Sequence, residues 1–388
     1  MLCEDLVRLG HSVTVVAAVP HYPDGFVSPL FSKHLFHYEE RKGVQIIRVL
    51  VPGGNRSNLY HRMSAFLVFQ LLAVSRGIRL KYDVLVVTNP AIETGLPFGI
   101  LSILKKRPVL LCVWDVYPEV GIRMGVFRNS LLTGFIGKAE DFCLKRANAI
   151  QVLGQGFVKE LSAHSVNPEK IAVIPPWLDT GFIRPLPRHN SFSHENNLDS
   201  CFVVLHAGNI GFSQGLEYIL SAARSFVDQP HIKFVFVGDG ANREQLVSQS
   251  RELGLSNVLF VPFQPREHLP EVLATADLAL ISMAPGIGNG SLPSKTFPIF
   301  ASGRPILAVT EDGSELWNVV NHSKAGVCVP PGNPGLLVSA LLELERSPKL
   351  RRQMALNGRE YSVMNHDRHS AARQFERILT LIMDKRHA

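Results

Sequence analysis

Short runs of apolar residues alternate along the whole chain with longer segments in which apolar residues recur at helical spacing. A bounded run of about five apolar residues is typical of a buried strand, and the gaps between runs leave room for crossover helices. The pattern therefore predicts parallel β-α units rather than hairpins. The predicted strands are residues 13–18, 44–51, 82–88, 108–114, 149–153, 202–206, 233–237, 258–261, 277–282, 305–309 and 325–329.

One polar, proline-containing segment, residues 180–200, interrupts this alternation and has the composition of a linker. A chain of 388 residues also exceeds what one hydrophobic core usually organises. We therefore predict two α/β domains. Their expected bounds are 1–179 for the N-terminal domain and 201–365 for the C-terminal domain, followed by a helical segment at 366–388.

The chain begins in an unusual place for a parallel α/β domain. Residues 1–10 carry apolar residues at helical spacing and end at Gly10, which is the pattern of the second half of an amphipathic helix. A strand and its glycine-rich loop normally come first, and neither precedes the strand predicted at 13–18. We therefore expect that a first strand is missing and that a sheet edge is exposed.

Residues 59–80 form one long helical pattern with an apolar centre, 63–74, and arginines on both sides. This centre is about a dozen residues long, whereas a helix needs about 20 residues to cross a bilayer. Two interpretations are open. The segment is either a buried core helix or a helix that lies in a membrane interface, with its basic residues on anionic headgroups.

Positive charge is concentrated in the first half of the chain. Residues 1–180 contain 20 Lys and Arg against 14 Asp and Glu, which gives +6 of the net +7. This favours an anionic membrane, a polyanion or a phosphorylated substrate as a partner, and a solvated basic surface fits as well. No aromatic and basic motif accompanies the charge, so we expect no nucleic acid. The five cysteines form no C-x-x-C pair and the chain has no D-x-D pair, so we expect no metal site.

Three glycine-rich turns follow predicted strands of the second domain, at 208–211, 238–240 and 286–290. Ligands of open α/β sheets collect at the carboxyl ends of the strands. Ser294 and Lys295 then open a predicted helix. Backbone N–H groups beside a lysine suit a phosphate, so one interpretation is a nucleotide site and the other is an ordinary strand-to-helix loop. The dinucleotide and Walker glycine motifs are absent.

In the first domain two carboxylates, Asp115 and Glu119, follow the strand predicted at 108–114. They are candidates for orienting or deprotonating an acceptor, and the alternative is that Asp115 caps a local turn. His21 and Tyr22 follow the first predicted strand and are candidates for the acceptor side of the same site. A rigid proline loop is the alternative for that segment.

These segments together resemble family-4 retaining glycosyltransferases with the GT-B fold. The similarity is greatest to the branch that builds bacterial cell-surface polysaccharides, which includes N-acetyl-L-fucosamine transferases of O-antigen assembly and colanic-acid transferases. The resemblance follows the family order over the whole chain. The segments that carry it are 10–16, 20–25, 114–119, 175–179, 208–217, 236–240, 293–295 and 301–305.

The resemblance implies two Rossmann-like, doubly wound parallel-sheet domains facing a cleft, with the last helix packing back on the first domain. It implies a nucleotide-sugar donor, with UDP as the nucleotide, and a polyprenyl-diphosphate-linked saccharide acceptor. The enzyme would work on the cytoplasmic membrane face, held there by the basic first domain and helix 59–80, without a metal or other cofactor. By carry-over the donor site contains Gly208, Asn209, Gly211, Gly238, Asp239, Gly240, Gly288, Asn289, Gly290, Ser291, Ser294 and Lys295.

The sequence departs from the family pattern at three places. The family's acidic pair falls on Gly290 and Pro298, and a proline has no side-chain group to hold ribose hydroxyls. Asn209 and Gln214 lie where many members carry arginine and lysine, and the first strand is expected to be missing. Two other functions stay open: a non-catalytic partner in a polysaccharide assembly complex, which the missing strand and Pro298 favour, and a GT-B-fold nucleotide-sugar epimerase.

Overall fold

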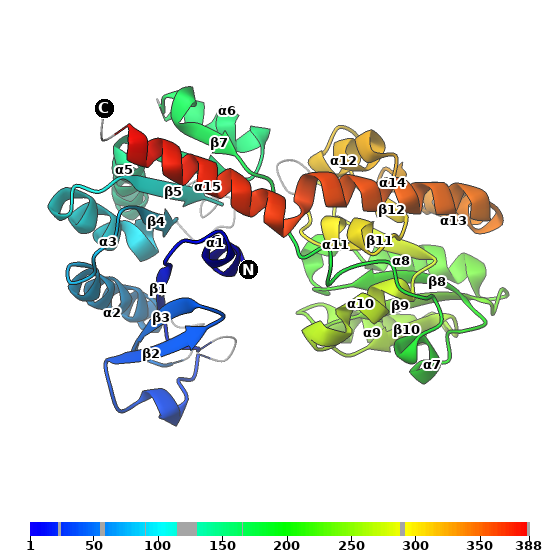
Figure 1. The fold of residues 1–388 in the computed structure, drawn as a ribbon. Helices are drawn as coiled ribbons and strands as arrows, with labels where there is room; N and C mark the ends of the chain where they lie inside the picture. The colour runs from blue at the N-terminus through cyan, green and yellow to red at the C-terminus, as the bar shows by residue number, and fades with distance from the viewer. Residues whose placement is uncertain are drawn as a thin grey trace. The chain divides into compact units, whose positions relative to one another are not determined.

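The computed structural model describes residues 1–21, 25–54, 59–89, 91–114, 130–164, 166–287 and 292–385. The chain divides into two units, each compact in itself (Figure 1). Unit 1 consists of Met1–Pro175 and His369–Ala388, and unit 2 consists of Pro176–Arg368. The last helix of the chain therefore belongs to unit 1, although all of unit 2 separates the two parts in the sequence.

Unit 1 contains two sheets. One has the order β4-β5-β6-β7 with all neighbours parallel, and the other has the order β1-β3-β2. β1 pairs with β3 in parallel, whereas β2 pairs with β3 in the antiparallel sense. The strands are β1 (Thr14–Ala18), β2 (Phe36–Arg41), β3 (Val44–Val49), β4 (Leu85–Thr88), β5 (Val109–Val113), β6 (Ala149–Val152) and β7 (Ile171–Val173).

The antiparallel strand β2 departs from the predicted all-parallel pattern. Its side chains are mostly exposed, so its sequence lacks the apolar run by which a buried strand is recognised. The two residues that join β2 to β3, Lys42 and Gly43, have φ values of +52° and +79°. Positive φ at both residues is the geometry of a type I′ hairpin turn.

The helices of unit 1 cover the four-stranded sheet and enclose its core. Phe98 of α3, Leu144 of α5 and Ile150 of β6 are fully buried there. Phe375 and Ile382 of the last helix, α15, are also buried. The α-helices are α1 (Leu2–Arg8), α2 (Leu59–Gly77), α3 (Ala91–Leu104), α5 (Ser130–Arg146), α6 (Gln155–Ala163) and α15 (Arg368–Asp384).

The helix α2 is not a buried core helix. It buries Gln70 and Ala73 but exposes a row of apolar side chains at helical spacing. The exposed residues are Tyr60, Met63, Leu67 and Leu71, followed by Ile78 just beyond the end of the helix. Within the described residues, no helix combines the length and the apolar character needed to cross a membrane.

Unit 2 is built on one six-stranded sheet in which all neighbours are parallel, with the order β10-β9-β8-β11-β12-β13. Side chains alternate between the faces of a strand. Phe234 and Phe236 of β9 accordingly enter one core cluster, and Val235 and Val237 enter another. The strands are β8 (Phe202–Ala207), β9 (Ile232–Val237), β10 (Val258–Val261), β11 (Leu278–Ser282), β12 (Ile306–Val309) and β13 (Gly326–Val329).

Helices cover both faces of this sheet, as expected for a doubly wound unit. The α-helices are α7 (Ser191–Glu195), α8 (Glu217–Ala223), α9 (Arg243–Glu252), α10 (Leu269–Ala274), α11 (Thr296–Ala301), α12 (Glu315–Ser323), α13 (Pro334–Arg346) and α14 (Pro348–His366). Short 3₁₀ turns lie at Pro29–Phe31 and Pro168–Lys170 in unit 1, and at Phe212–Gln214, Arg224–Phe226 and Arg266–His268 in unit 2.

Residues 180–200, whose composition is that of a linker, lie inside unit 2. The side chain of Asn190 accepts a hydrogen bond from the backbone of Ser193 and caps α7. Phe192 and Leu198 are buried in the same cluster as the strand β8. Proline and polar residues therefore mark irregular backbone here, while two buried apolar side chains hold the segment against the sheet.

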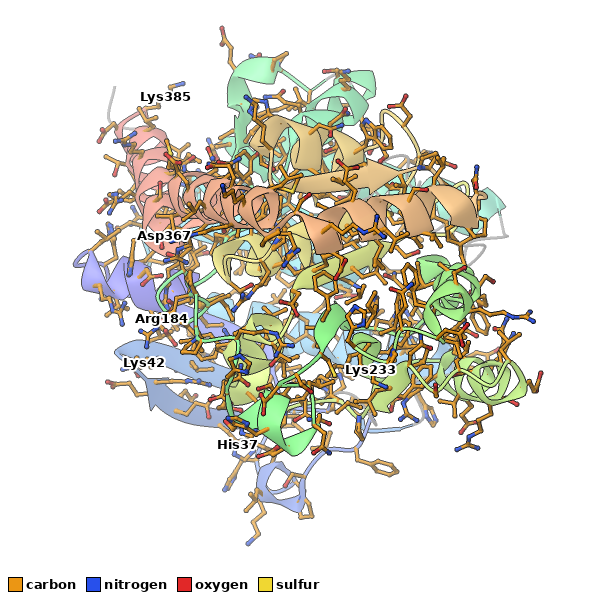
Figure 2. All side chains as sticks on the ribbon, turned by 90° about the vertical axis from the view of Figure 1, so that its right-hand side faces the viewer. His37, Lys42, Arg184, Lys233, Asp367 and Lys385 are labelled. Carbon is orange, nitrogen blue, oxygen red and sulfur yellow. The ribbon has the colours of Figure 1, made fainter. Side chains whose placement is uncertain are left out.

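The end of α14 is joined to the first residues of unit 2 by backbone hydrogen bonds. Leu178 N donates to His366 O at 2.9 Å, and Arg368 N donates to Leu178 O at 2.9 Å. The carboxylate of Asp367, the residue labelled in Figure 2, accepts from the Thr180 hydroxyl at 2.6 Å. The two places where the chain passes between the units are thus held side by side within unit 2.

Candidate functional site

The candidate donor site lies at the carboxyl edge of the unit 2 sheet, where β8 and β9 end in turns that contain glycine. Gly208 follows β8 with φ +133°, and Gly238 follows β9 with φ +140°. A Cβ atom at Gly238 would lie 2.0 Å from the carbonyl oxygen of Gly208. The two turns are therefore in backbone contact, which only a glycine at position 238 allows.

The rest of the 238–240 turn is fixed to the 208–211 turn in the same way. A Cβ atom at Gly240 would lie 2.5 Å from the Ile210 carbonyl oxygen and 2.6 Å from Asn209 Oδ1. Ile210 N donates to the carbonyl oxygen of Asp239 at 2.8 Å, and Asn242 N donates to that of Ile210 at 3.1 Å. Two of the three predicted glycine-rich turns thus form one continuous backbone surface.

Lys295 brings a third segment to this surface. It is the N-cap residue of α11 and its side chain is half-buried. The ammonium Nζ donates to Gln214 Oε1 at 3.1 Å and lies 3.3 Å from His206 Nε2. A Cβ atom built on Gly208 would lie 3.5 Å from this Nζ. The ammonium group therefore lies directly beside the Gly208 turn.

The partners of Lys295 are neutral. Among the described residues, no carboxylate forms an ion pair with it, and its neighbours are an amide and an imidazole. Burial lowers the pKa of Lys295 to about 8. Unpaired positive charge is costly in a partly buried place unless an anion joins it. The arrangement suits a phosphate group.

His206, the residue of β8 beneath this ammonium, is fully buried. Burial and the nearby charge of Lys295 lower the pKa of His206 to about 3, so the ring is neutral. Its Nε2 lies 3.3 Å from Lys295 Nζ and 3.3 Å from the Asn209 carbonyl oxygen. A neutral ring nitrogen either accepts from the ammonium or donates to the carbonyl. His206 therefore links the position of Lys295 to that of the Asn209 turn.

Some of the other predicted donor-site residues lie in the part of the chain that the structure describes, and the rest lie outside it. Asn209 packs over Gly211, where a Cβ atom would lie 2.7 Å from Asn209 Nδ2, and Asp239 Oδ1 accepts from Gly240 N at 2.8 Å. Ser294 is exposed next to Lys295. Outside the described residues lie the predictions Gly288, Asn289, Gly290 and Ser291, together with Asp115, Glu119 and Tyr22 of the first domain.

Two side chains at this edge escaped the sequence-based prediction. His206 offered a signal, because it is the one ionisable residue inside an otherwise apolar strand. Glu311 follows β12 at the same edge, and its Oε1 accepts from Gly286 N at 2.7 Å. Glu311 thereby anchors the start of the third glycine-rich turn. A carboxylate two residues after a buried strand was the signal available for it.

In unit 1 a polar network holds the carboxyl ends of β4, β5 and β6. The buried carboxylate of Glu140 accepts from Asn89 Nδ2 at 3.2 Å and from Ala91 N at 2.9 Å. Asn89 Oδ1 in turn accepts from Trp114 N at 3.0 Å, and Trp114 Nε1 donates to Gln151 Oε1 at 3.1 Å. This network fixes the backbone from which the segment with Asp115 and Glu119 departs.

His21 lies just beyond β1, where its Nδ1 donates to the Val19 carbonyl oxygen at 2.8 Å. It lines a small pocket of about 40 Å³ together with His61 and Arg62 of α2. The structure therefore places His21 beside two basic residues of the helix with the exposed apolar row. The described residues contain no group of three or more His, Cys, Asp or Glu side chains placed to hold a metal ion.

Two family models match the chain, one in each half. The model of the glycosyl transferase 4-like domain matches residues 1–177, and that of glycosyl transferases group 1 matches residues 189–361.

Among the described residues β1 pairs with β3 alone, so its other side is a sheet edge. The first match nevertheless starts at residue 1, so the expectation of a missing first strand is not supported.

The chain is 25% identical over 390 residues to WcaI of Escherichia coli K12, a glycosyl transferase assigned to colanic acid biosynthesis. The alignment covers 96% of this chain and 93% of WcaI. This relative spans both units.

Two solved structures share the fold at low sequence identity. Sucrose-phosphate synthase from Thermosynechococcus elongatus is 17% identical with a TM-score of 0.73, over 99% of this chain and 92% of that protein. Anabaena HepE in complex with UDP is 16% identical with a TM-score of 0.69, over 95% of this chain and 99% of HepE. The chain therefore belongs to the group 1, family-4-like glycosyltransferases and has the GT-B fold, built from two parallel-sheet Rossmann-like domains.

Proposed function

We propose that this glycosyltransferase moves a sugar from a UDP-sugar to a lipid-linked saccharide during the biosynthesis of a cell-surface polysaccharide, with retention of configuration at the anomeric carbon. The similarity to WcaI supports the assignment to surface polysaccharides. The Anabaena HepE structure, which contains UDP, supports a uridine nucleotide. Unit 2 would bind the donor, with the diphosphate beside Gly208 and the nucleoside beside Gly238 and Gly240.

The observation that carries this proposal is the position of Lys295. It is a half-buried cation without a carboxylate partner among the described residues, held by Gln214 and His206 over the Gly208 turn. Negative charge grows on the departing diphosphate as the bond to the sugar breaks. A positive group already fixed at that place stabilises the leaving group without first having to reorganise.

Unit 1 would bind the acceptor, a saccharide on a polyprenyl diphosphate. Asp115 and Glu119 would orient or deprotonate its attacking hydroxyl. The exposed apolar row of α2, with Leu67 and Leu71 at 52% and 54% exposure, would lie in the membrane interface at the cytoplasmic face. Arginines near both ends of this helix would meet anionic headgroups.

Donor binding is the first experiment. A thermal-shift panel of UDP-, GDP- and ADP-sugars is expected to show one UDP-sugar that raises the unfolding temperature, because a ligand of the native state stabilises it. In Lys295→Ala the affinity for that sugar should fall by about tenfold or more, since a hydrogen bond to a charged group is lost.

The matched control is Lys324→Ala, which removes an exposed lysine from the end of α12. It should leave donor affinity unchanged. No shift with any nucleotide-sugar, or equal affinities in the two alanine variants, would remove the donor site from unit 2. Selective binding without transfer to any lipid-linked acceptor would instead favour the non-catalytic partner.

A further inference from the structure

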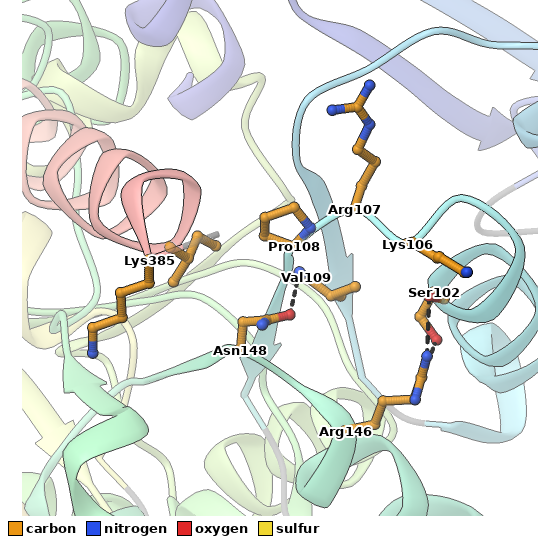
Figure 3. A pocket seen from close by; sticks show the side chains of 9 residues that line it. Ser102, Lys106, Arg107, Pro108, Val109, Arg146, Asn148 and Lys385 are labelled. Atoms are coloured by element: carbon orange, nitrogen blue, oxygen red, sulfur yellow. Dashed lines mark hydrogen bonds between the residues drawn. The ribbon is translucent and has the colours of Figure 1, made fainter. Parts of the chain in front are cut away.

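The amino-terminal edge of the four-stranded sheet in unit 1, opposite the edge with Trp114, contains a pocket of about 320 Å³. In parallel β-α units the helices run against the strands, so helices end where strands begin. α3 and α5 end at this pocket, β5 starts there, and the end of α15 lies beside them (Figure 3). The pocket is separate from the donor site, which belongs to unit 2.

Four cations line the pocket and no carboxylate does: Lys106, Arg107, Arg146 and Lys385. Three of them, Lys106, Arg146 and Lys385, form no ion pair with the described residues. Arg107 Nη1 lies 4.0 Å from the Oδ1 of Asp83, whose side chain is 85% exposed. An exposed pair at this distance neutralises little charge. The pocket therefore presents concentrated positive charge that the described residues do not balance.

Two of the donors in the pocket, Arg146 and Asn148, are held in place before any ligand arrives. Arg146 Nε donates to Ser102 Oγ at 2.7 Å and Arg146 Nη2 donates to the Ser102 carbonyl oxygen at 3.1 Å. A guanidinium has five N–H donors, so three remain for a ligand. Asn148 Oδ1 accepts from Val109 N at 2.9 Å, which leaves the Asn148 Nδ2 group as a further donor (Figure 3).

Lys106 occupies its place at a cost in backbone energy. It follows the end of α3 with φ +49°, in the left-handed region. Glycine is the residue preferred there, and any other residue costs about 1–2 kcal/mol. Lys42 and Lys324 have similar φ values, so what sets Lys106 apart is its place at the pocket.

Cations at helix ends also interact favourably with the helix dipole. That effect accounts for cations at or just beyond the end of their own helix, which are Arg146 on α5, Lys106 after α3 and Lys385 after α15. It does not account for Arg107, which precedes β5, nor for the placement of Lys106 and Arg146, from two separate helices, on the same side of one pocket (Figure 3).

We propose that this pocket is a binding site for a phosphate group. A phosphate presents several anionic oxygens in different directions, and Lys106 and Arg146, from the ends of α3 and α5, lie on the same side of the pocket beside Ser102 (Figure 3). The volume of about 320 Å³ is at the lower end of the range for small-ligand sites, so it holds one phosphate-bearing group with some water. This site is additional to the proposed function and does not depend on it.

The phosphate has two possible sources, a soluble phosphate compound and the headgroup of an anionic lipid. Ile103 and Leu104, between the lining residues Ser102 and Lys106, are 52% and 60% exposed. Exposed apolar residues next to cations fit a lipid surface. Both sources supply the same chemistry, so the experiment has one arm for each.

The test variant is Lys106→Gly, which removes one ammonium group and places the preferred residue at a left-handed position. The fold should therefore be kept, with an unfolding temperature that is unchanged or raised. Its matched control is Lys324→Gly, because Lys324 also has a left-handed φ, +51°, and lies in unit 2. A second variant, Lys385→Ala, removes an exposed cation at the end of α15.

In the soluble arm, inorganic phosphate is titrated by calorimetry into protein that carries Lys295→Ala, so that the donor site does not contribute. In the lipid arm, sedimentation is measured with phosphatidylcholine vesicles that contain or lack phosphatidic acid. We expect binding in at least one arm, weakened about tenfold by Lys106→Gly, less by Lys385→Ala, which lies on the other side of the pocket, and not at all by Lys324→Gly.

The arm in which binding occurs identifies the source of the phosphate. Binding of inorganic phosphate points to a soluble compound, and binding only to phosphatidic acid vesicles points to a headgroup. Absence of binding in both arms overturns the proposal. Equal affinities of the Lys106→Gly and Lys324→Gly proteins would overturn it too, because the charge at the pocket would then have no part in binding.

Discussion

Lys295 and His206 form a pair of basic side chains 3.3 Å apart, and both have a lowered pKa. Burial lowers the pKa of Lys295 to about 8, and burial together with the charge of Lys295 lowers that of His206 to about 3. The ring is therefore an uncharged neighbour near neutral pH. A bound diphosphate would favour the protonated ammonium, so donor affinity and the charge of Lys295 are linked.

This linkage predicts how donor affinity depends on pH. Below pH 8 the Lys295 ammonium is already charged and affinity is constant. Above pH 8 binding must first take up a proton, so the affinity for a UDP-sugar should be about tenfold weaker at pH 9 than at pH 7. Calorimetric titrations across this range measure the profile.

The control for this profile is Lys295→Arg, whose guanidinium stays charged throughout. Its affinity should not fall between about pH 7 and pH 9. A wild-type affinity that is equally flat would show that the ammonium of Lys295 does not take part in donor binding.

At the scale of elements, the site depends on two strand-to-helix turns that share a backbone contact. The 208–211 and 238–240 turns belong to neighbouring strands, β8 and β9, which pair in parallel. Because both turns leave at the carboxyl edge, their glycines meet, and the carbonyl oxygen of Gly208 occupies the space where a side chain at 238 would begin.

Gly238→Ala is therefore expected to destabilise unit 2 by about 3 kcal/mol and to abolish donor binding, since it adds both a clash and an unfavourable φ. Gly254→Ala provides the comparison. Gly254 also has a positive φ, +64°, but a Cβ atom added there would meet no atom within 4 Å, so about 1 kcal/mol is expected. Urea unfolding of both variants measures the difference.

If Gly238→Ala were no less stable than Gly254→Ala, the close contact between the two turns would not exist in solution. If it were less stable but still bound the donor normally, the turns would be a structural feature and not part of the site.

At the scale of the whole molecule, the last helix completes the first unit. α15 starts where α14 ends, yet its buried residues Phe375 and Ile382 belong to unit 1. It also makes a polar contact with that unit, because Glu376 Oε1 lies 3.0 Å from His11 Nε2. Stability of unit 1 therefore depends on residues that all of unit 2 separates from the rest of that unit in the sequence.

Phe375→Ala is expected to lower the free energy of unfolding of unit 1 by about 3–5 kcal/mol and to leave unit 2 unchanged, because the ring is fully buried. Leu381→Ala on the same helix serves as the control. Its side chain is 59% exposed, so it should change stability by less than about 0.5 kcal/mol. Hydrogen exchange of β4–β7 against β8–β13 separates the two units.

Hydrogen exchange that becomes faster in both units, or that changes in neither unit, would contradict this assignment of α15. A large effect of Leu381→Ala would mean that the helix lies on unit 1 by a different face.

The amino-acid sequence by itself determined the parallel β-α architecture, because buried strands must be apolar on both faces and therefore appear as short apolar runs. It also placed the 208–211 and 238–240 turns directly after strands, which is where the structure has them. Strand β2 escaped it, since an exposed strand paired on one side carries no apolar run. The sequence also did not predict that residues 180–200 pack within unit 2. Two buried side chains, Phe192 and Leu198, hold this segment against the sheet, although its overall composition is that of a linker.

Only the tertiary structure decided which residues meet. His206, Gln214 and Lys295 are up to 89 positions apart, and they converge because parallel strands end at one edge of a sheet. The basic pocket of unit 1 likewise brings together residues of α3, β5, α5 and α15, at the amino-terminal edge of the four-stranded sheet of that unit. Periodicity reports the environment of a residue within its own element, whereas such contacts depend on strand order, which local sequence does not encode.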